Sequence, residues 1–188
     1  MKRIKWNSPV ILWFVLICGV VLLLNYATAG ATNNLLFSIY KSSFKDPLFY
    51  IRIFGHVLGH ANIEHYLNNM MMLLLVGPLL EEKYGSSKMI TIMAVVAVVT
   101  GIVHIFLQGN TALLGASGIV FAFILLASTT GRRKDNEIPV TLILVALLYI
   151  GEQVYQGIFL KDTVSQLTHI VGGIIGAGFG MMVKTKNN

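Results

Sequence analysis

The sequence predicts an all-α membrane protein in which six transmembrane helices form one bundle. Of its 188 residues, 55% are hydrophobic and only 12% are charged, a balance that is not typical of a water-soluble domain with a single core. The apolar residues also gather in six long runs. These runs are too long and too continuous to be the short, alternating strands of a membrane barrel. We therefore expect residues 1–188 to form a single six-span membrane domain.

Each apolar run contains about 17 to 19 residues. At a rise of about 1.5 Å per residue, such a helix can cross a hydrocarbon core of about 30 Å. In chain order, the predicted spans are 9–26, 63–80, 89–107, 111–128, 138–155 and 167–183. The sequence shows no internal repeat, and the longest connection lies between the first and second spans.

The basic residues are distributed unevenly between the two sides of this six-span arrangement. One side carries four: Lys41, Lys45, Arg52 and Lys161. The other carries ten: Lys2, Arg3, Lys5, Lys83, Lys88, Arg132, Arg133, Lys134, Lys184 and Lys186. The positive-inside rule then predicts a multi-pass cell-membrane protein with both termini in the cytoplasm. This bias also explains the net charge of +6, so we expect no nucleic-acid partner.

The first 29 residues fit a second interpretation. A basic start, an apolar stretch and Ala27-Thr28-Ala29 match the pattern of a cleaved secretory signal peptide. Cleavage would leave five spans. An uncleaved first span keeps the charge bias consistent along the whole chain, and this favours six.

Four polar side chains are predicted to lie at similar depth on the outer side of the membrane. Ser117 lies within about two turns of the outer end of the fourth span, and His169 lies at the outer end of the sixth. His65 and Asn69 are four residues apart in the second span and therefore share one helix face. Taken singly, each residue fits an ordinary packing or interface role. Their coincidence at one depth favours a functional site.

These residue types suit nucleophilic catalysis. A serine hydroxyl needs a base to take its proton, and a neutral imidazole is suited to that role near pH 7, which makes Ser117 and His169 a candidate pair. The amide of Asn69, the ring of His65 and the backbone N–H of Ser117 are candidate donors to an oxyanion. The nearest acidic residue to His169 is Asp162, in the preceding loop. We therefore expect a Ser-His dyad rather than a triad.

Small residues predict a close crossing of the fourth and sixth spans. Gly172, Gly176 and Gly180 follow His169 at spacings of three, four and four, and Gly118 with Ala122 forms a matching pair. Stripes of this kind allow helix backbones to approach closely in membranes. Ordinary helix packing without catalysis would use the same pattern.

Three motifs in chain order resemble those of the rhomboid intramembrane serine proteases, in their minimal six-span form. The first is "HVLGHANIEHYLNN", with His56, His60, His65 and Asn69; the second is "GASG", with Gly115, Ser117 and Gly118; the third is "HIVGGIIG", which begins at His169. Weaker similarities are "EEKYG", with Glu81 and Gly85, and Arg52 four residues before His56.

The resemblance implies cleavage of the transmembrane segments of other membrane proteins near their outer ends, in a cavity open to the exterior. It implies Ser117 as the nucleophile, His169 as the general base and His65 with Asn69 as oxyanion donors, without a metal or cofactor. Partners would be transmembrane substrates and the lipid bilayer, with the fifth span and residues 156–165 as a lateral gate. The residues expected to support the site are Gly115, Gly118, Phe121, Gly172 and Gly176.

The chain departs from the family pattern at two positions. Phe121 stands where many relatives have a tyrosine stacked on the histidine, so the aromatic platform is kept without its hydroxyl. Ile51 precedes Arg52 where relatives often have tryptophan. Both departures leave the predicted dyad in place.

Three other classes of protein fit the sequence less well. A zinc site could draw on His56, His60, Glu64 and His65, but the H-E-x-x-H pattern of metalloproteases is absent. A transporter would need polar residues reaching both faces, and few ionisable residues lie in the inner halves of the spans. A non-catalytic relative that binds membrane clients is the strongest alternative. The presence of both Ser117 and His169 argues against it.

Overall fold

A computed structural model of the chain describes residues 6–108, 111–129, 138–159 and 163–183. These residues form an all-α structure, as the composition predicts. Its helices are α1 (Pro9–Ala27), α2 (Ala31–Leu36), α3 (Pro47–Gly55), α4 (Ile63–Tyr84), α5 (Ser86–Gln108), α6 (Ser117–Ser128), α7 (Val140–Phe159) and α8 (Thr163–Met182).

The longer helices follow the predicted apolar runs, with one exception. The run predicted at 111–128 is helical only from Ser117 onward, so a helix starting at residue 111 is wrong. Within the described residues, helices at 9–27 and 86–107 are long and apolar enough to cross a membrane, and those at 117–128 and 166–182 are apolar but shorter. The number of membrane crossings stays a prediction from the sequence.

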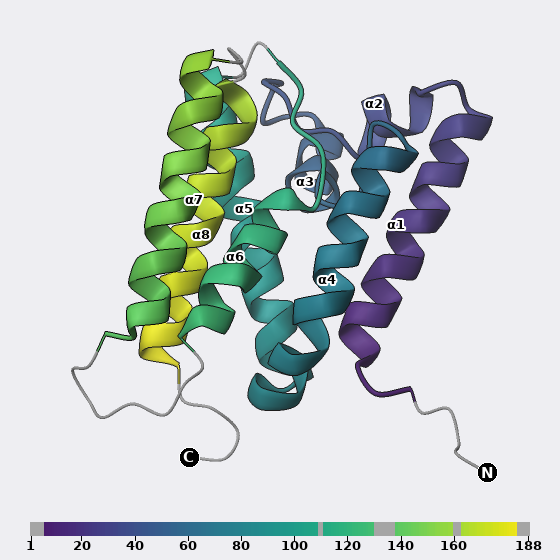
Figure 1. Cartoon of the computed structure of the whole chain (residues 1–188). Helices are drawn as coiled ribbons and strands as arrows, with labels where there is room; N and C mark the ends of the chain where they lie inside the picture. Colours follow the sequence, from purple (N-terminus) through teal and green to yellow (C-terminus); the bar gives the residue numbers. More distant parts are fainter. Residues whose placement is uncertain (1–5, 109–110, 130–137, 160–162, 184–188) are drawn as a thin grey trace.

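The helices form one bundle with α1 at one edge and the α7–α8 pair at the other (Figure 1). The short helix α6 lies inside this bundle, where it contacts α4, α5, α7 and, most extensively, α8. The connection between α1 and α4, which contains α2 and α3, lies at the end of the bundle opposite to the start of α1 and the end of α8 (Figure 1). The central helix α6 is therefore the element around which a site can be assembled.

A buried carboxylate joins α1, α4 and α5 at the end of the bundle where α1 begins. Glu81 is 5% exposed, and its two oxygens accept hydrogen bonds from the backbone N–H groups of Val10 (3.1 Å) and Ile11 (3.2 Å). The hydroxyl of Ser86 also donates to it, at 2.7 Å. A carboxylate is well placed here because the first turn of a helix has N–H groups without intrahelical acceptors and a partial positive charge.

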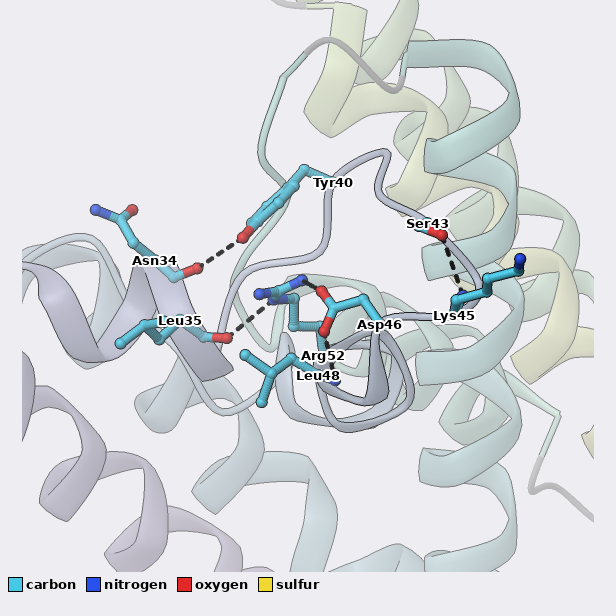
Figure 2. A network of polar contacts seen from close by, with 8 residues as sticks. All are labelled: Asn34, Leu35, Tyr40, Ser43, Lys45, Asp46, Leu48 and Arg52. Carbon is cyan, nitrogen blue, oxygen red and sulfur yellow. Dashed lines mark hydrogen bonds and ion pairs between the residues drawn. The ribbon is translucent and has the colours of Figure 1, made fainter.

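Arg52 organises the connection between α1 and α4 (Figure 2). Its side chain is buried, donating from Nε to the carbonyl of Leu35 and from Nη1 to Asp46 Oδ2, both at 2.9 Å. Asp46 also caps α3, since its Oδ1 accepts from Leu48 N at 3.0 Å. The ring of Tyr40 lies 4.6 Å from the guanidinium carbon. A buried cation with these partners fixes α2, α3 and the segment between them to one another.

Candidate active site

The segment from Thr111 to Ala116 carries the chain from the end of the bundle near α2 and α3 to the middle, where α6 begins (Figure 1). Two contacts hold it in place. Leu113 and Ile39 exchange both backbone hydrogen bonds at 2.9 Å, as an isolated antiparallel bridge. The Nε2–H of His104 donates to the carbonyl of Thr111 at 2.9 Å. Extended backbone inside a membrane bundle needs such partners, because lipid offers none.

Gly115 brings this segment against α4. Its backbone has a φ of +123°, a conformation that side chains disfavour, and its N–H donates to the carbonyl of His56 at 2.9 Å. A Cβ built on Gly115 would lie 2.7 Å from His65 Nε2 and 3.9 Å from Asn69 Nδ2. Gly115 of the "GASG" turn therefore packs close to His65 and Asn69, although they are far apart in the sequence.

His65 and Asn69 lie on the first turns of α4. The side chain of Asn62 caps this helix by accepting from His65 N at 2.8 Å. Asn69 is 5% exposed, and within the described residues its Nδ2 has no hydrogen-bond acceptor. A buried amide donor without a protein partner next to Gly115 is available to a bound group.

Ser117 is the first residue of α6, partly buried and flanked by the buried residues Ala116 and Gly118. The carbonyl of Ala116 accepts the first bonds of the helix, from Ile119 N (2.9 Å) and Val120 N (3.0 Å). The N–H groups of the first helical residues have no intrahelical acceptor. A serine at this position offers its hydroxyl beside backbone donors.

The crossing of α6 and α8 has almost no space between the backbones. A Cβ built on Gly172 would lie 2.9 Å from the carbonyl carbon of Gly118, and one built on Gly176 would lie 2.6 Å from that of Ala122. The close packing predicted from the spacing of these small residues is therefore confirmed. Next to His169, the carbonyl oxygen of Thr168 lies 3.8 Å from a Cβ position on Gly118, so the chain around His169 is near the start of α6.

Phe121 is one turn after Ser117 on α6, and its ring packs on that of His169. The ring centroids are 4.4 Å apart and the planes are inclined by 43°. His169 is partly buried. This aromatic contact limits the orientations open to the imidazole. Asp162, the nearest acidic residue in the sequence, lies outside the described residues, as do the basic residues at 2, 3, 5, 132–134, 161, 184 and 186.

Two other histidines before α4 are buried. His56 donates from Nε2 to the carbonyl of Ala97 at 2.9 Å, and His60 donates from Nδ1 to that of Leu58 at 3.1 Å. Burial lowers the pKa of both rings to about 4, so both are neutral at pH 7. No group of three metal-ligating side chains converges anywhere in the described ranges. His56 thus joins the segment before α4 to α5, whereas the bond of His60 is local and its ring packs on His65 and Tyr66 of α4.

Sequence reasoning missed part of the framework of this site. His104, which belongs to none of the motifs in the sequence, holds the segment that leads into Ser117. A histidine inside an apolar run is a usable signal, because an ionisable group is costly there. Ile39, which pairs with Leu113 of that segment, and Asn33, which holds the loop before α4, have no such signal.

Comparison with known proteins identifies the family. A family model described as "Rhomboid domain" matches residues 48–186, about three quarters of the chain. The chain belongs to the rhomboid family. The match covers every residue of the candidate site, from His65 on α4 to His169 on α8. Together with the apolar helices, it makes this rhomboid a membrane protein.

Three relatives show the extent of the similarity. The chain is 27% identical over 140 residues to Rhomboid-related protein 1 of Caenorhabditis elegans, covering 70% of this chain and 39% of that protein. It is 29% identical over 128 residues to Rhomboid protease GlpG of Pectobacterium atrosepticum (66% of this chain, 45% of the relative). It is 25% identical over 182 residues to Rhomboid protease GlpG of Salmonella paratyphi A (94% and 64%). This rhomboid therefore spans less than two thirds of the length of each.

Proposed function

We propose that this rhomboid is an intramembrane serine endopeptidase that cleaves transmembrane segments of other membrane proteins through Ser117 and His169. The observation that carries the proposal is the close contact of three chain segments. Gly115, before Ser117, lies against His65 and Asn69 of α4, and Gly118, after Ser117, lies against Gly172 of α8. Two of the relatives above are named proteases, which supports the same class of activity.

In the proposed reaction, the hydroxyl oxygen of Ser117 attacks the carbonyl carbon of the scissile peptide bond. His169 takes the hydroxyl proton and later gives it to the leaving amine nitrogen, so that the C–N bond breaks and an ester on Ser117 remains. A water molecule, deprotonated by His169, then attacks the ester and releases the carboxylate product. The contact with Phe121 orients the imidazole, and the proposed catalytic pair is a Ser-His dyad.

The tetrahedral intermediates carry a negative charge on the former carbonyl oxygen. Its proposed donors are Asn69 Nδ2, which is buried without an acceptor in the described part of the chain, and His65 Nε2, which faces Gly115. The backbone N–H of Ser117 is the third. Such donors act strongly because they are fixed in advance in a site with little water.

The proposed substrates are transmembrane segments with small residues at the scissile bond, cut near their outer ends. The site would open to the cell exterior, with both termini in the cytoplasm, as the charge bias predicts. Helix α7 contacts both α6 and α8, and it forms one edge of the bundle (Figure 1). A helix at this edge is a suitable lateral gate, together with residues 156–165, whose side chains lie outside the described ones.

The test is cleavage of a panel of single-span membrane substrates by the purified protein in liposomes, next to the variants Ser117→Ala and His169→Ala. We expect the parent to cut at a defined site and both variants to lose at least about 10³-fold in rate. Activity should survive a chelator. Equal cleavage by the parent and Ser117→Ala would refute the proposal. A folded parent that binds the substrates without cutting any of them would favour a client-binding role.

A further inference from the structure

The peptide bond between His60 and Ala61 connects α2 to the ring of His65. Its carbonyl oxygen accepts a hydrogen bond from Asn33 Nδ2 at 2.9 Å. Its N–H, which belongs to Ala61, points to His65 Nδ1 at 3.5 Å. In a trans peptide unit the C=O and N–H groups lie in one plane and point in opposite directions. A side chain that fixes the carbonyl therefore also fixes the direction of the N–H group.

This contact, at the long end of the hydrogen-bond range, favours one of the two neutral tautomers of His65. A backbone N–H can only donate, so Nδ1 of His65 must act as the acceptor. A neutral imidazole then carries its proton on Nε2. Nε2 is the atom that faces Gly115, with 2.7 Å to a Cβ position there. The ring thus presents a donor toward the segment that carries Ser117, as an oxyanion site requires.

Asn33 is itself held firmly. It is 5% exposed, and its backbone N–H donates to Asn25 Oδ1 at 3.1 Å, which ties α2 to the last turn of α1. Gly59 packs beside the amide, with 3.2 Å from a Cβ position on Gly59 to Asn33 Oδ1. The ring of His60 lies edge-on against that of His65, with 5.1 Å between centroids. The carbonyl of the His60–Ala61 peptide is therefore tied through Asn33 to α1 and α2, outside the catalytic helices.

We propose that Asn33 is a positioning residue, which holds the His60–Ala61 peptide so that His65 keeps its proton on Nε2 and faces the reaction site as a donor. Without the amide of Asn33, the peptide is free to rotate. Its carbonyl can then turn toward Nδ1, which favours the tautomer protonated at Nδ1 and makes Nε2 an acceptor. An acceptor at that place repels an oxyanion. The catalytic consequence rests on the proposed protease function, whereas the tautomer of His65 does not.

The experiment measures the ring nitrogens of His65 directly, by ¹⁵N NMR of histidine-labelled protein in detergent near pH 7.5. The variants are Asn33→Leu, which keeps the branched shape of the side chain but cannot donate a hydrogen bond, and Asn33→Ala. The matched control is Asn34→Leu, at the next residue of α2, where the side chain is exposed and only the backbone carbonyl accepts a bond, from Tyr40. We expect a protonated Nε2 in the parent and the control, and a population protonated at Nδ1 in both Asn33 variants.

Cleavage assays on the same samples give the catalytic consequence. Both Asn33 variants should lose at least about tenfold in kcat with KM within about twofold. The loss should not exceed that of His65→Ala, for which removal of an oxyanion donor predicts roughly 10²- to 10³-fold. A His65 ring that stays fully protonated on Nε2 in folded Asn33 variants would overturn the proposal. So would the failure of both variants to fold, because the role of Asn33 would then be structural. A parent without protease activity would refute the proposed function, while the NMR result would still decide the role of Asn33.

Discussion

The contact between Gly172 and Gly118 allows one prediction to be worked out in detail. In Gly172→Ala, the new Cβ would touch the carbonyl oxygen of Gly118 and lie 2.9 Å from its carbonyl carbon and 3.1 Å from its Cα. Carbon atoms pack best at about 3.5 to 4.0 Å, so α6 and α8 must separate by roughly 0.5 to 1 Å. Backbone atoms cannot rotate away as a side chain can. We expect destabilisation of about 1 to 3 kcal/mol from overpacking. A displacement of about 1 Å between nucleophile and base predicts a loss of about 10²-fold in kcat.

Thermal unfolding in detergent and cleavage of a transmembrane substrate measure the two effects. Gly178→Ala is the matched control, because it lies on the same helix and its Cβ would meet nothing within 4 Å. It should keep parental activity and lose no stability, since alanine is the better helix former. If Gly172→Ala matched Gly178→Ala in both measurements, the backbone contact of α6 and α8 would not be what aligns the site.

Three further predictions follow from the surrounding contacts. Arg52→Ala should lower stability by about 1 to 3 kcal/mol, because it removes the donor to the carbonyl of Leu35 and the ion-pair partner of the partly exposed Asp46; an unchanged unfolding temperature would contradict this. For His56 and His60 the pKa is about 4 in the folded state against an ordinary 6.5. Between these two pKa values the folded state therefore binds fewer protons than the unfolded state. The free energy of unfolding should be highest above about pH 6.5 and should decrease toward pH 4, by up to about 1.4 kcal/mol per pH unit for each ring. Unfolding at several pH values tests this, with His56→Gln expected to reduce the slope. Phe121→Leu should reduce kcat about tenfold by removing the aromatic contact with His169, whereas Phe121→Tyr should keep it; equal rates for the two would refute an orienting role.

Most helices could be predicted because lipid imposes long apolar runs on any chain that crosses it. The start of α6 could not. Leu113 and Leu114 continue the apolar run before Ser117, but Leu113 is buried in extended backbone paired with Ile39. Hydropathy reports burial in an apolar setting and does not distinguish helix from extended chain. The local signal was Gly115, whose φ of +123° ends any helical continuation.

The site was predictable where it follows helical spacing. His65 and Asn69 share a face because they are four residues apart, and the small residues of α8 meet those of α6 for the same reason. The contribution of Asn33 was not predictable. Its bond to the carbonyl of His60 joins α2 to the loop before α4 across 27 residues of sequence, and hydrogen bonds to loop carbonyls follow no periodic pattern.

Covalent labelling of the purified protein with a fluorophosphonate tests the central claim most directly, because it needs no knowledge of the substrate. The serine oxygen displaces fluoride from phosphorus, and the base takes the proton. The account predicts one adduct per chain, mapped to Ser117, absent in Ser117→Ala and strongly slowed in His169→Ala. It should be unchanged in Ser128→Ala, where the hydroxyl on the same helix donates to the carbonyl of Leu125. A folded protein that takes no label, or takes it at another residue, would contradict the account.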